Sequence, residues 1–179
     1  MIERDEIPRI LDTTDLHLRP LELTDAQGMF EMLSDPETVR YWSEDAFNEI
    51  SQAQVKINHY LESEKRGDSV SWALCLRGNN EIIGKCVLFN FSDANQRAEI
   101  GYLLNRNFWG HGLMRQALEK VIHIAFRQMG LHRLEADVDP GNRGSLVLLE
   151  RLGFKQEGLL KERWFVAGHW CDSLLLGLL

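Results

Sequence analysis

The stretch Asn107-Phe108-Trp109-Gly110-His111-Gly112-Leu113-Met114 carries the strongest structural signal in the chain. It stands between a predicted strand over residues 97–104 and a long predicted helix that follows Gly112. Two glycines one residue apart let the backbone turn so that several N–H groups converge, and the positive end of the next helix adds to that field. Such a turn suits a phosphate or pyrophosphate. The glycine pair alone is weak support, because many turns use glycine.

Two other phosphate-binding loops do not fit this stretch. A P-loop requires the pattern GxxxxGK[ST], which the sequence does not contain. A dinucleotide-binding fingerprint requires a third Gly or Ala three residues after Gly112, where Arg115 stands. That fingerprint also follows the first strand of its unit, whereas this turn follows several predicted strands.

The size and charge of the chain limit its class. Its 179 residues, of which 44% are apolar, are enough for one buried core, so we predict a single domain over residues 1–179. The net charge of -7 disfavours general nucleic-acid binding. Residues 1–54 are strongly acidic and residues 105–133 are basic. Both stretches are typical of solvated helix faces. Alternatively, the acidic stretch faces a cationic ligand and the basic stretch faces an anionic one.

The hydrophobic periodicity predicts a sheet that carries helices. Residues 70–76 alternate with period two, and the turn Gly78-Asn79-Asn80 predicts a hairpin with the next strand. The pattern Thr24-x-x-Gln27 predicts a capping box for the first helix. The expected strands cover residues 16–21, 70–76, 81–89, 97–104, 134–138, 154–162 and 170–178, and the expected helices cover about 26–33, 51–66, 113–129 and 142–152. This order predicts an α+β (mixed α/β) fold of about seven strands and about four helices.

A second informative segment runs from Asp137 to Ser145. Asn142 is suited to cap the helix that follows it, a role that needs no ligand. The preceding strand places Glu135 and Asp137 on one face, opposite Leu134 and its apolar neighbours. A pair of carboxylates on one strand face serves either as a solvated surface or as a source of acid–base chemistry.

Together these segments resemble the GNAT superfamily of N-acetyltransferases over about residues 14–177. The family's pyrophosphate pattern, Gln/Arg-x-x-Gly-x-Gly/Ala, reads Asn107-x-x-Gly110-x-Gly112 here, with an Asn at the first position. The segments at 98–104 and 108–118, the pair Asn142-x-x-Ser145 and the run Leu152-Gly153-Phe154 are similar to ribosomal-protein N-terminal alanine and serine acetyltransferases.

The resemblance implies a twisted, mostly antiparallel sheet that splits between its fourth and fifth strands. Acetyl-CoA, the cosubstrate, would lie in the split, with its pantetheine arm along the strand that ends at Leu104 and its pyrophosphate on the glycine turn. The residues implied in its binding are Tyr102, Leu103, Leu104, Asn107, Trp109, Gly110, His111, Gly112, Leu113, Met114, Asn142 and Ser145.

The resemblance also implies direct transfer of the acetyl group to an amine, without an acyl-enzyme. A carboxylate then accepts the proton of the amine, and Glu99 and Asp137 are the candidates. Many family members protonate the leaving thiolate with a helix tyrosine, whose position here is held by Leu149. Ser145 is therefore the candidate acid. A loop position that carries a catalytic Glu in part of the subgroup holds Trp164 here.

Other chemistries have little support in the sequence. The three cysteines Cys75, Cys86 and Cys171 form no CxxC pair and are odd in number, which disfavours a disulfide framework and indicates a reducing cytoplasm. The histidines show neither HxxxH nor HExxH spacing, so we expect no metal. The charged N-terminus and the short apolar runs predict neither a signal peptide nor a membrane span.

The expected function is N-acetylation of a primary amine with acetyl-CoA. A protein N-terminus, such as that of a ribosomal protein, is the first candidate acceptor. A small amine such as a polyamine or an aminoglycoside is the second. A non-catalytic acyl-CoA-binding module is a third hypothesis, because fold alone does not fix function. We expect no nucleic-acid or membrane partner, and a monomer or homodimer.

Overall fold

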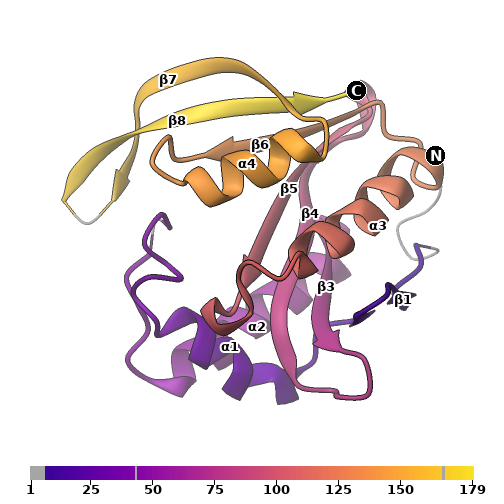
Figure 1. Cartoon of the computed structure of the whole chain (residues 1–179), viewed down its shortest axis with the longest axis vertical. Coiled ribbons are helices and arrows are strands. Elements are labelled where there is room, and N and C mark those ends of the chain that lie inside the picture. Colours follow the sequence, from indigo (N-terminus) through magenta and orange to yellow (C-terminus); the bar gives the residue numbers. More distant parts are fainter. Residues whose placement is uncertain (1–6, 43, 167) are drawn as a thin grey trace.

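A computed structural model describes residues 7–42, 44–166 and 168–179. These residues form one twisted sheet with helices on both faces (Figure 1). The strands are β1 (Leu11–Asp12), β2 (Leu16–Arg19), β3 (Ser69–Leu76), β4 (Ile82–Ser92), β5 (Arg97–Leu104), β6 (Arg133–Val138), β7 (Lys155–Val166) and β8 (His169–Leu178). The helices are α1 (Ala26–Leu33), α2 (Ile50–Lys65), α3 (Leu113–Arg127) and α4 (Arg143–Arg151). None of these helices is long and apolar enough to cross a membrane.

The strand order β1-β2-β3-β4-β5-β6-β8-β7 explains where the sheet opens. Every neighbouring pair is antiparallel except β5 and β6, which run parallel. Their register starts at Arg97↔Arg133 and ends at Glu99↔Glu135, so the two strands separate beyond these residues. The split predicted between the fourth and fifth strands is therefore confirmed as the gap between β5 and β6.

Two apolar clusters lie on opposite faces of the sheet. α3 and α4 pack on one face with Trp72, Ile100 and the even-numbered residues of β6. α1 and α2 pack on the other face, on side chains from β3, β4 and β5 such as Leu103. Because side chains alternate along a strand, Ile100 and Tyr102 of β5 face α3 and α4, whereas Glu99 and Leu103 face the side of α1 and α2.

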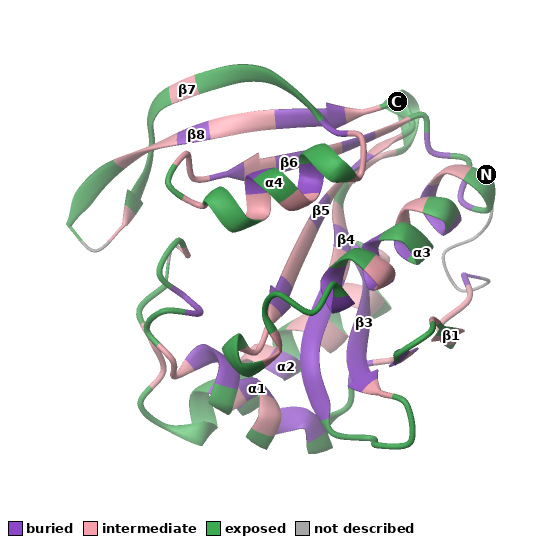
Figure 2. Ribbon diagram, in the orientation of Figure 1, coloured by how far each residue is buried: buried purple, intermediate pink, exposed green. Residues whose placement is uncertain are grey.

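The terminal hairpin extends past the rest of the sheet. β6 pairs with β8 only from Leu134↔Leu178 to Val138↔Leu174, so the tip of β7–β8 continues beyond the end of β6. Figure 2 shows β7 exposed along almost its whole length, while β3 and β4 are buried. Both hairpin strands are longer than predicted.

Two further predictions need correction. The capping box lies at Glu22 and Asp25 and not at Thr24 and Gln27, because a 3-10 turn (Leu23–Asp25) precedes α1. The Thr24 hydroxyl instead donates to Glu22 at 3.3 Å. The sheet also has eight strands where about seven were expected, because β1 is only two residues long and two residues show no periodicity.

Candidate active site

The glycine turn forms an open, concave backbone surface before α3. Gly110 and Gly112 have φ of 79° and 74°, in the left-handed region that favours glycine. A Cβ at either position would meet no atom within 4 Å, so the turn faces open space. Gly112 caps α3 without a side-chain hydrogen bond, which leaves N–H groups of the first helical turn available to an anion. The turn therefore fits a pyrophosphate.

The side chains around the turn are mostly engaged elsewhere. Leu113 and Met114 are buried in the core, so they offer a ligand only their backbone. Arg106 forms an ion pair with Asp35 at 3.0 Å, and Arg115 forms one with Glu119 at 2.8 Å. Asn107 and His111 lie on the exposed part of the turn. Backbone N–H groups are thus the main anion donors of this turn.

The edge of β5 presents backbone groups to the split. The N–H of Asn105 donates to the carbonyl of Ile83 at 2.8 Å. Because hydrogen-bonded and open positions alternate along an antiparallel pair, Leu103 turns its backbone toward β4, while Tyr102 and Leu104 turn theirs toward the split. The indole of Trp109 donates to the Leu104 carbonyl at 2.8 Å. Leu103, predicted to pair with pantetheine, is therefore less well placed than its two neighbours.

Asn142 and Ser145 open α4 on the other side of the split. The Asn142 side chain accepts a hydrogen bond from the Ser145 N–H at 3.1 Å, which confirms the predicted cap. The Ser145 hydroxyl in turn lies 2.5 Å from the hydroxyl of Tyr102. This contact joins β5 and α4 across the split.

Tyr102 was predicted to bind acetyl-CoA, but the sequence did not predict the contact of its hydroxyl group with Ser145. Burial raises the pKa of Tyr102 to about 12, so the phenol is neutral at pH 7 and able to donate a proton. The helix position at which many family members carry a tyrosine is held by Leu149, which is fully buried in the core. The available signal was the alternation of β5, which places Tyr102 on the α4 face together with Ile100.

Glu99 lies on the opposite face, beside few donors. One of its carboxylate oxygens accepts a hydrogen bond from the Asn90 side chain at 3.1 Å. Its register partner Glu135 is ion-paired with Arg97 at 2.6 Å and with Arg133 at 2.7 Å. Among the described residues, Glu135 therefore has two cationic partners, whereas the donor to Glu99 is the neutral side chain of Asn90.

Asp137, the second predicted base, is held by three donors. The Ser173 hydroxyl donates to one of its carboxylate oxygens. Its other oxygen accepts from the Trp164 indole at 3.3 Å and pairs with Arg163 at 2.9 Å. The two predicted carboxylates thus lie on the same face of the sheet in different surroundings, and Trp164 reaches one of them.

The segment between α1 and α2 closes one side of this region. Asp35 ties it to the glycine turn through Arg106, and the ring of Tyr41 contacts Gly141 in the loop after β6. A Cβ at Gly141 would lie 3.1 Å from that ring.

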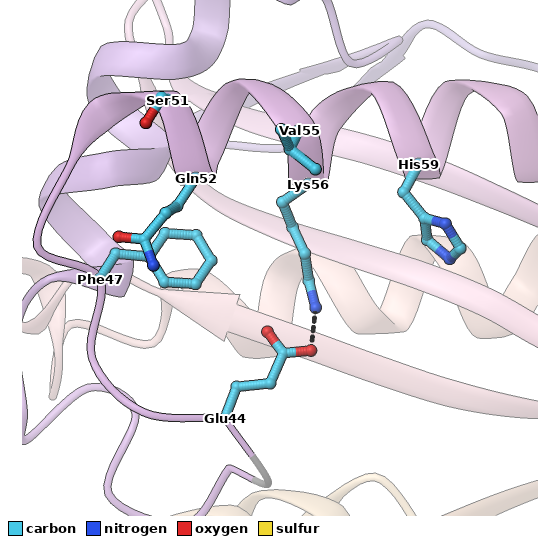
Figure 3. Close-up of a pocket in the computed structure, with 7 residues that line it drawn as sticks. All are labelled: Glu44, Phe47, Ser51, Gln52, Val55, Lys56 and His59. Carbon is cyan, nitrogen blue, oxygen red and sulfur yellow. Dashed lines mark hydrogen bonds and ion pairs between the residues drawn. The ribbon is translucent and has the colours of Figure 1, made fainter.

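A separate pocket of about 500 Å³ lies along α2. Figure 3 shows Phe47, Lys56 and His59 among its lining side chains, with Lys56 ion-paired to Glu44. Its lining includes no residue of the β5–β6 split, so we treat it as distinct from the reaction site.

Two of the three cysteines lie in the core, whereas Cys171 is half-buried and pairs with Trp164 in the β7–β8 ladder. Cys75 and Cys86 are buried, and burial raises the pKa of the Cys86 thiol to about 12. Within residues 7–42, 44–166 and 168–179, no cluster of three or more His, Cys, Asp or Glu side chains is arranged to hold a metal ion.

Comparison with known proteins agrees with this geometry. Residues 15–155 match the family model described as an acetyltransferase (GNAT) domain. An uncharacterized N-acetyltransferase p20 of Bacillus licheniformis is 36% identical, over 94% of this chain and 95% of that protein. The [ribosomal protein uS5]-alanine N-acetyltransferase of Escherichia coli is 32% identical, over 70% of this chain and 65% of its own length. The spermidine N(1)-acetyltransferase of Escherichia coli is 27% identical, over 88% and 82%.

A solved structure extends the likeness to three dimensions. The RimJ protein of Mycobacterium smegmatis, determined in complex with CoA-disulfide, superimposes with a TM-score of 0.82 and 27% identity. The alignment covers 91% of this chain and 81% of that one. The β5–β6 split, the glycine turn before α3 and these matches lead to one conclusion: the chain belongs to the GNAT family of acetyl-CoA-dependent N-acetyltransferases.

Proposed function

We propose that this enzyme transfers the acetyl group of acetyl-CoA to the amino terminus of a protein, with a ribosomal protein as the first candidate. The open acceptor side of the sheet carries this proposal. The apolar cluster of α1 and α2 includes side chains of β3, β4 and β5 but none of β6, β7 or β8. Glu99 and Asp137 lie on this face, beside the split. A face of β6 to β8 that lies outside this cluster would leave room for a chain terminus that projects from a larger surface.

The proposed chemistry uses the two faces of the split for two proton transfers. Glu99, directly or through a water molecule, accepts a proton from the incoming ammonium. The neutral amine attacks the thioester carbonyl, the new N–C bond forms, and the C–S bond breaks. Backbone N–H groups at the split stabilise the negative charge on the carbonyl oxygen. The thiolate of CoA then takes a proton from the Ser145 hydroxyl, and Tyr102 re-supplies Ser145 through their hydrogen bond. The attacking nitrogen loses its second proton to solvent water before the C–S bond breaks, and water returns a proton to Tyr102.

A small amine is the second candidate acceptor. It is supported by the similarity to a spermidine acetyltransferase and by the acidic composition of residues 1–54, which suits a cationic acceptor of either kind. We keep the cytoplasm as the expected location, on the basis of the cysteine content alone.

One experiment separates these candidates. The purified protein is mixed with acetyl-CoA and a panel of N-terminal peptides, polyamines and aminoglycosides, and thiol release is followed. The proposal expects turnover with peptides and little with small amines, and the reverse result would select the second candidate. Acetyl-CoA near 100 times its Kd should stabilise the fold by about 2.7 kcal/mol, and NAD should not. Binding without turnover for every acceptor would instead indicate a non-catalytic acyl-CoA-binding module.

A further inference from the structure

We propose that Asp137 is a positioning residue and not the base. Its carboxylate fastens the β7–β8 hairpin to the end of β6, and this holds the Trp164 indole as a wall of the acceptor approach that sets acceptor choice. The inference rests on the proposed function, because it concerns the acceptor side of the same reaction. It leaves Glu99 as the group that accepts the proton of the amine.

The contacts of Asp137 use both of its carboxylate oxygens. The Ser173 hydroxyl donates to Oδ1, while the Trp164 indole N–H at 3.3 Å and the Arg163 guanidinium at 2.9 Å share Oδ2. All three donors belong to the hairpin, and the Asp137 side chain is only 19% exposed. An incoming ammonium would have to displace one of them before it reached the carboxylate. Glu99 accepts one hydrogen bond, from Asn90.

The position of Asp137 explains why a fastening is needed there. It is the last residue of β6 on this face, and the β6–β8 ladder ends one residue later at Val138↔Leu174. Beyond this residue pair, the described part of the hairpin has no further backbone pairing with β6. The register of β7 shifts between Leu160 and Trp164, where Glu162 has φ of 50°. At this irregularity the side chains of two successive residues, Arg163 and Trp164, both contact the carboxylate of Asp137.

The fastened hairpin places an aromatic ring beside the acceptor approach. Trp164 is 46% exposed and lies on the Asp137 face of the hairpin. Tyr41, 37% exposed, contacts Gly141 in the loop that directly follows β6. The rings of Trp164 and Tyr41 therefore both lie beside the short segment from Asp137 to Gly141, at the end of β6. This segment is next to the point where the sheet opens. Phe165 pairs with Trp170 at 5.0 Å and neither ring contacts Asp137 in the described structure, which makes Trp170 a matched control.

The test measures the hydrogen exchange of the hairpin and the KM of the acceptor separately. Hydrogen–deuterium exchange of residues 160–172 reports the fastening, with or without turnover. We expect Asp137→Ala to raise exchange there at least several-fold. With the best acceptor of the panel, Asp137→Ala and Trp164→Ala should each raise the acceptor KM about tenfold or more and leave the acetyl-CoA KM unchanged. Trp164→Phe, which keeps a ring but lacks the N–H, should raise the acceptor KM less than Trp164→Ala does. Trp170→Ala should change neither readout.

The pH profile distinguishes a positioning residue from a base. Asp137→Asn should keep the midpoint of the rising limb of kcat against pH, whereas Glu99→Gln should flatten that limb. Loss of the limb in Asp137→Asn, with hairpin exchange at the parent level, would overturn the proposal and make Asp137 the base. Unchanged exchange and an unchanged acceptor KM in Asp137→Ala would overturn it as well. If the parent turned over no acceptor, the proposed function would fail while the exchange experiment still tested the fastening.

Discussion

The hydroxyl groups of Tyr102 and Ser145 lie 2.5 Å apart, one on β5 and the other at the first turn of α4. They bridge β5 and α4 across the split, on the face opposite Glu99. Because burial raises the pKa of Tyr102 to about 12, the pair keeps a proton available for the leaving thiolate of the proposed reaction. The acid and the base of the proposed reaction therefore approach the split from opposite sides of one sheet.

Removing either hydroxyl should slow the chemical step. We expect Tyr102→Phe and Ser145→Ala each to lower kcat on the order of 10- to 100-fold, with a smaller effect on the acetyl-CoA KM. The parent should show no fall in kcat from Tyr102 ionisation below about pH 11, because its pKa is raised to about 12. Tyr60→Phe is the control, since Tyr60 is a half-buried phenol on α2, on the other face of the sheet. A steady-state pH profile measures these effects, and full kcat in both variants would remove the pair from the mechanism.

The loss of Glu99 should reduce turnover without reducing acetyl-CoA affinity. Glu99→Gln keeps the size and the acceptor oxygen for Asn90 but cannot accept the amine proton. We expect kcat to fall on the order of 100-fold or more, with the acetyl-CoA Kd nearly unchanged. Calorimetric titration gives the affinity and thiol release gives the rate. Glu157→Gln, on the exposed hairpin strand, controls for loss of a surface charge; equal kinetics in the two variants would contradict the assignment.

A side chain at Gly112 should weaken acetyl-CoA binding. Gly112→Val adds a β-branched side chain to the concave turn and opposes its φ of 74°. We expect the acetyl-CoA Kd to rise about tenfold or more, measured by thermal shift against ligand concentration. Gly78→Val is the matched control, because Gly78 has φ of 81° and equally open surroundings in the β3–β4 turn. Both variants carry a similar backbone cost, so equal losses of affinity would point to general destabilisation.

Lys85 should limit the stability of the fold at neutral pH. Its ammonium lies 3.6 Å from the centre of the Tyr60 ring, and burial lowers the pKa of Lys85 to about 7 from 10.5. Between these values the unfolded chain binds a proton that the folded chain does not bind, so this group makes stability rise with pH from about 7 to 10.5. Lys85→Met should raise the free energy of unfolding at pH 7 by roughly 1–3 kcal/mol.

Urea unfolding at pH 7 and pH 10 checks this prediction. The advantage of Lys85→Met should shrink at the higher pH, because the parent then loses its penalty. Lys56→Met is the control, since that lysine forms an ion pair with Glu44 and should show no such gain. If Lys85→Met had a lower free energy of unfolding than the parent at both pH values, the contacts of the Lys85 side chain would stabilise the fold by more than its burial destabilises it.

Turnover should need neither a thiol nor a metal. Cys171→Ser, Cys75→Ala and Cys86→Ala, made singly, should retain kcat, although the two buried substitutions should lower stability by about 1 kcal/mol or more. Chelator treatment should leave the rate unchanged. A covalent acetyl–cysteine adduct in the mass spectrum of the parent during turnover would contradict direct transfer.

The sequence predicted most of the fold because its signals are local. β5 and the start of α3 follow from alternation and from the glycine turn, and they lie at the expected residues. The cap by Asn142 is likewise a contact within one helical turn. β1 escaped prediction because its two residues are a strand only through their pairing with β2. The capping box lies two residues earlier than predicted, because a 3-10 turn precedes the start of the helix.

The candidate site was predicted in its residues but not in its contacts. Tyr102 and Ser145 are 43 residues apart, and Asp137 and Ser173 are 36 apart. Their meeting depends on how far β5 and β6 diverge and on where the hairpin bends. Both properties arise from packing across the sheet, which a residue pattern does not report. The different hydrogen-bond and ion-pair partners of Glu99 and Asp137 could therefore be identified only from the three-dimensional structure.

The short parallel ladder between β5 and β6 also has a consequence for how the chain folds. β1 to β5 pair in chain order, as do β7 and β8, although the connection from β2 to β3 contains α1 and α2. Among the described residues, the only backbone strand pairing between the two sides is the ladder that ends at Glu99↔Glu135, where Arg97 and Glu135 form an ion pair across 38 residues of sequence. We therefore expect this seam to form late in folding and to open first when the native protein fluctuates, and the split lies directly beside it.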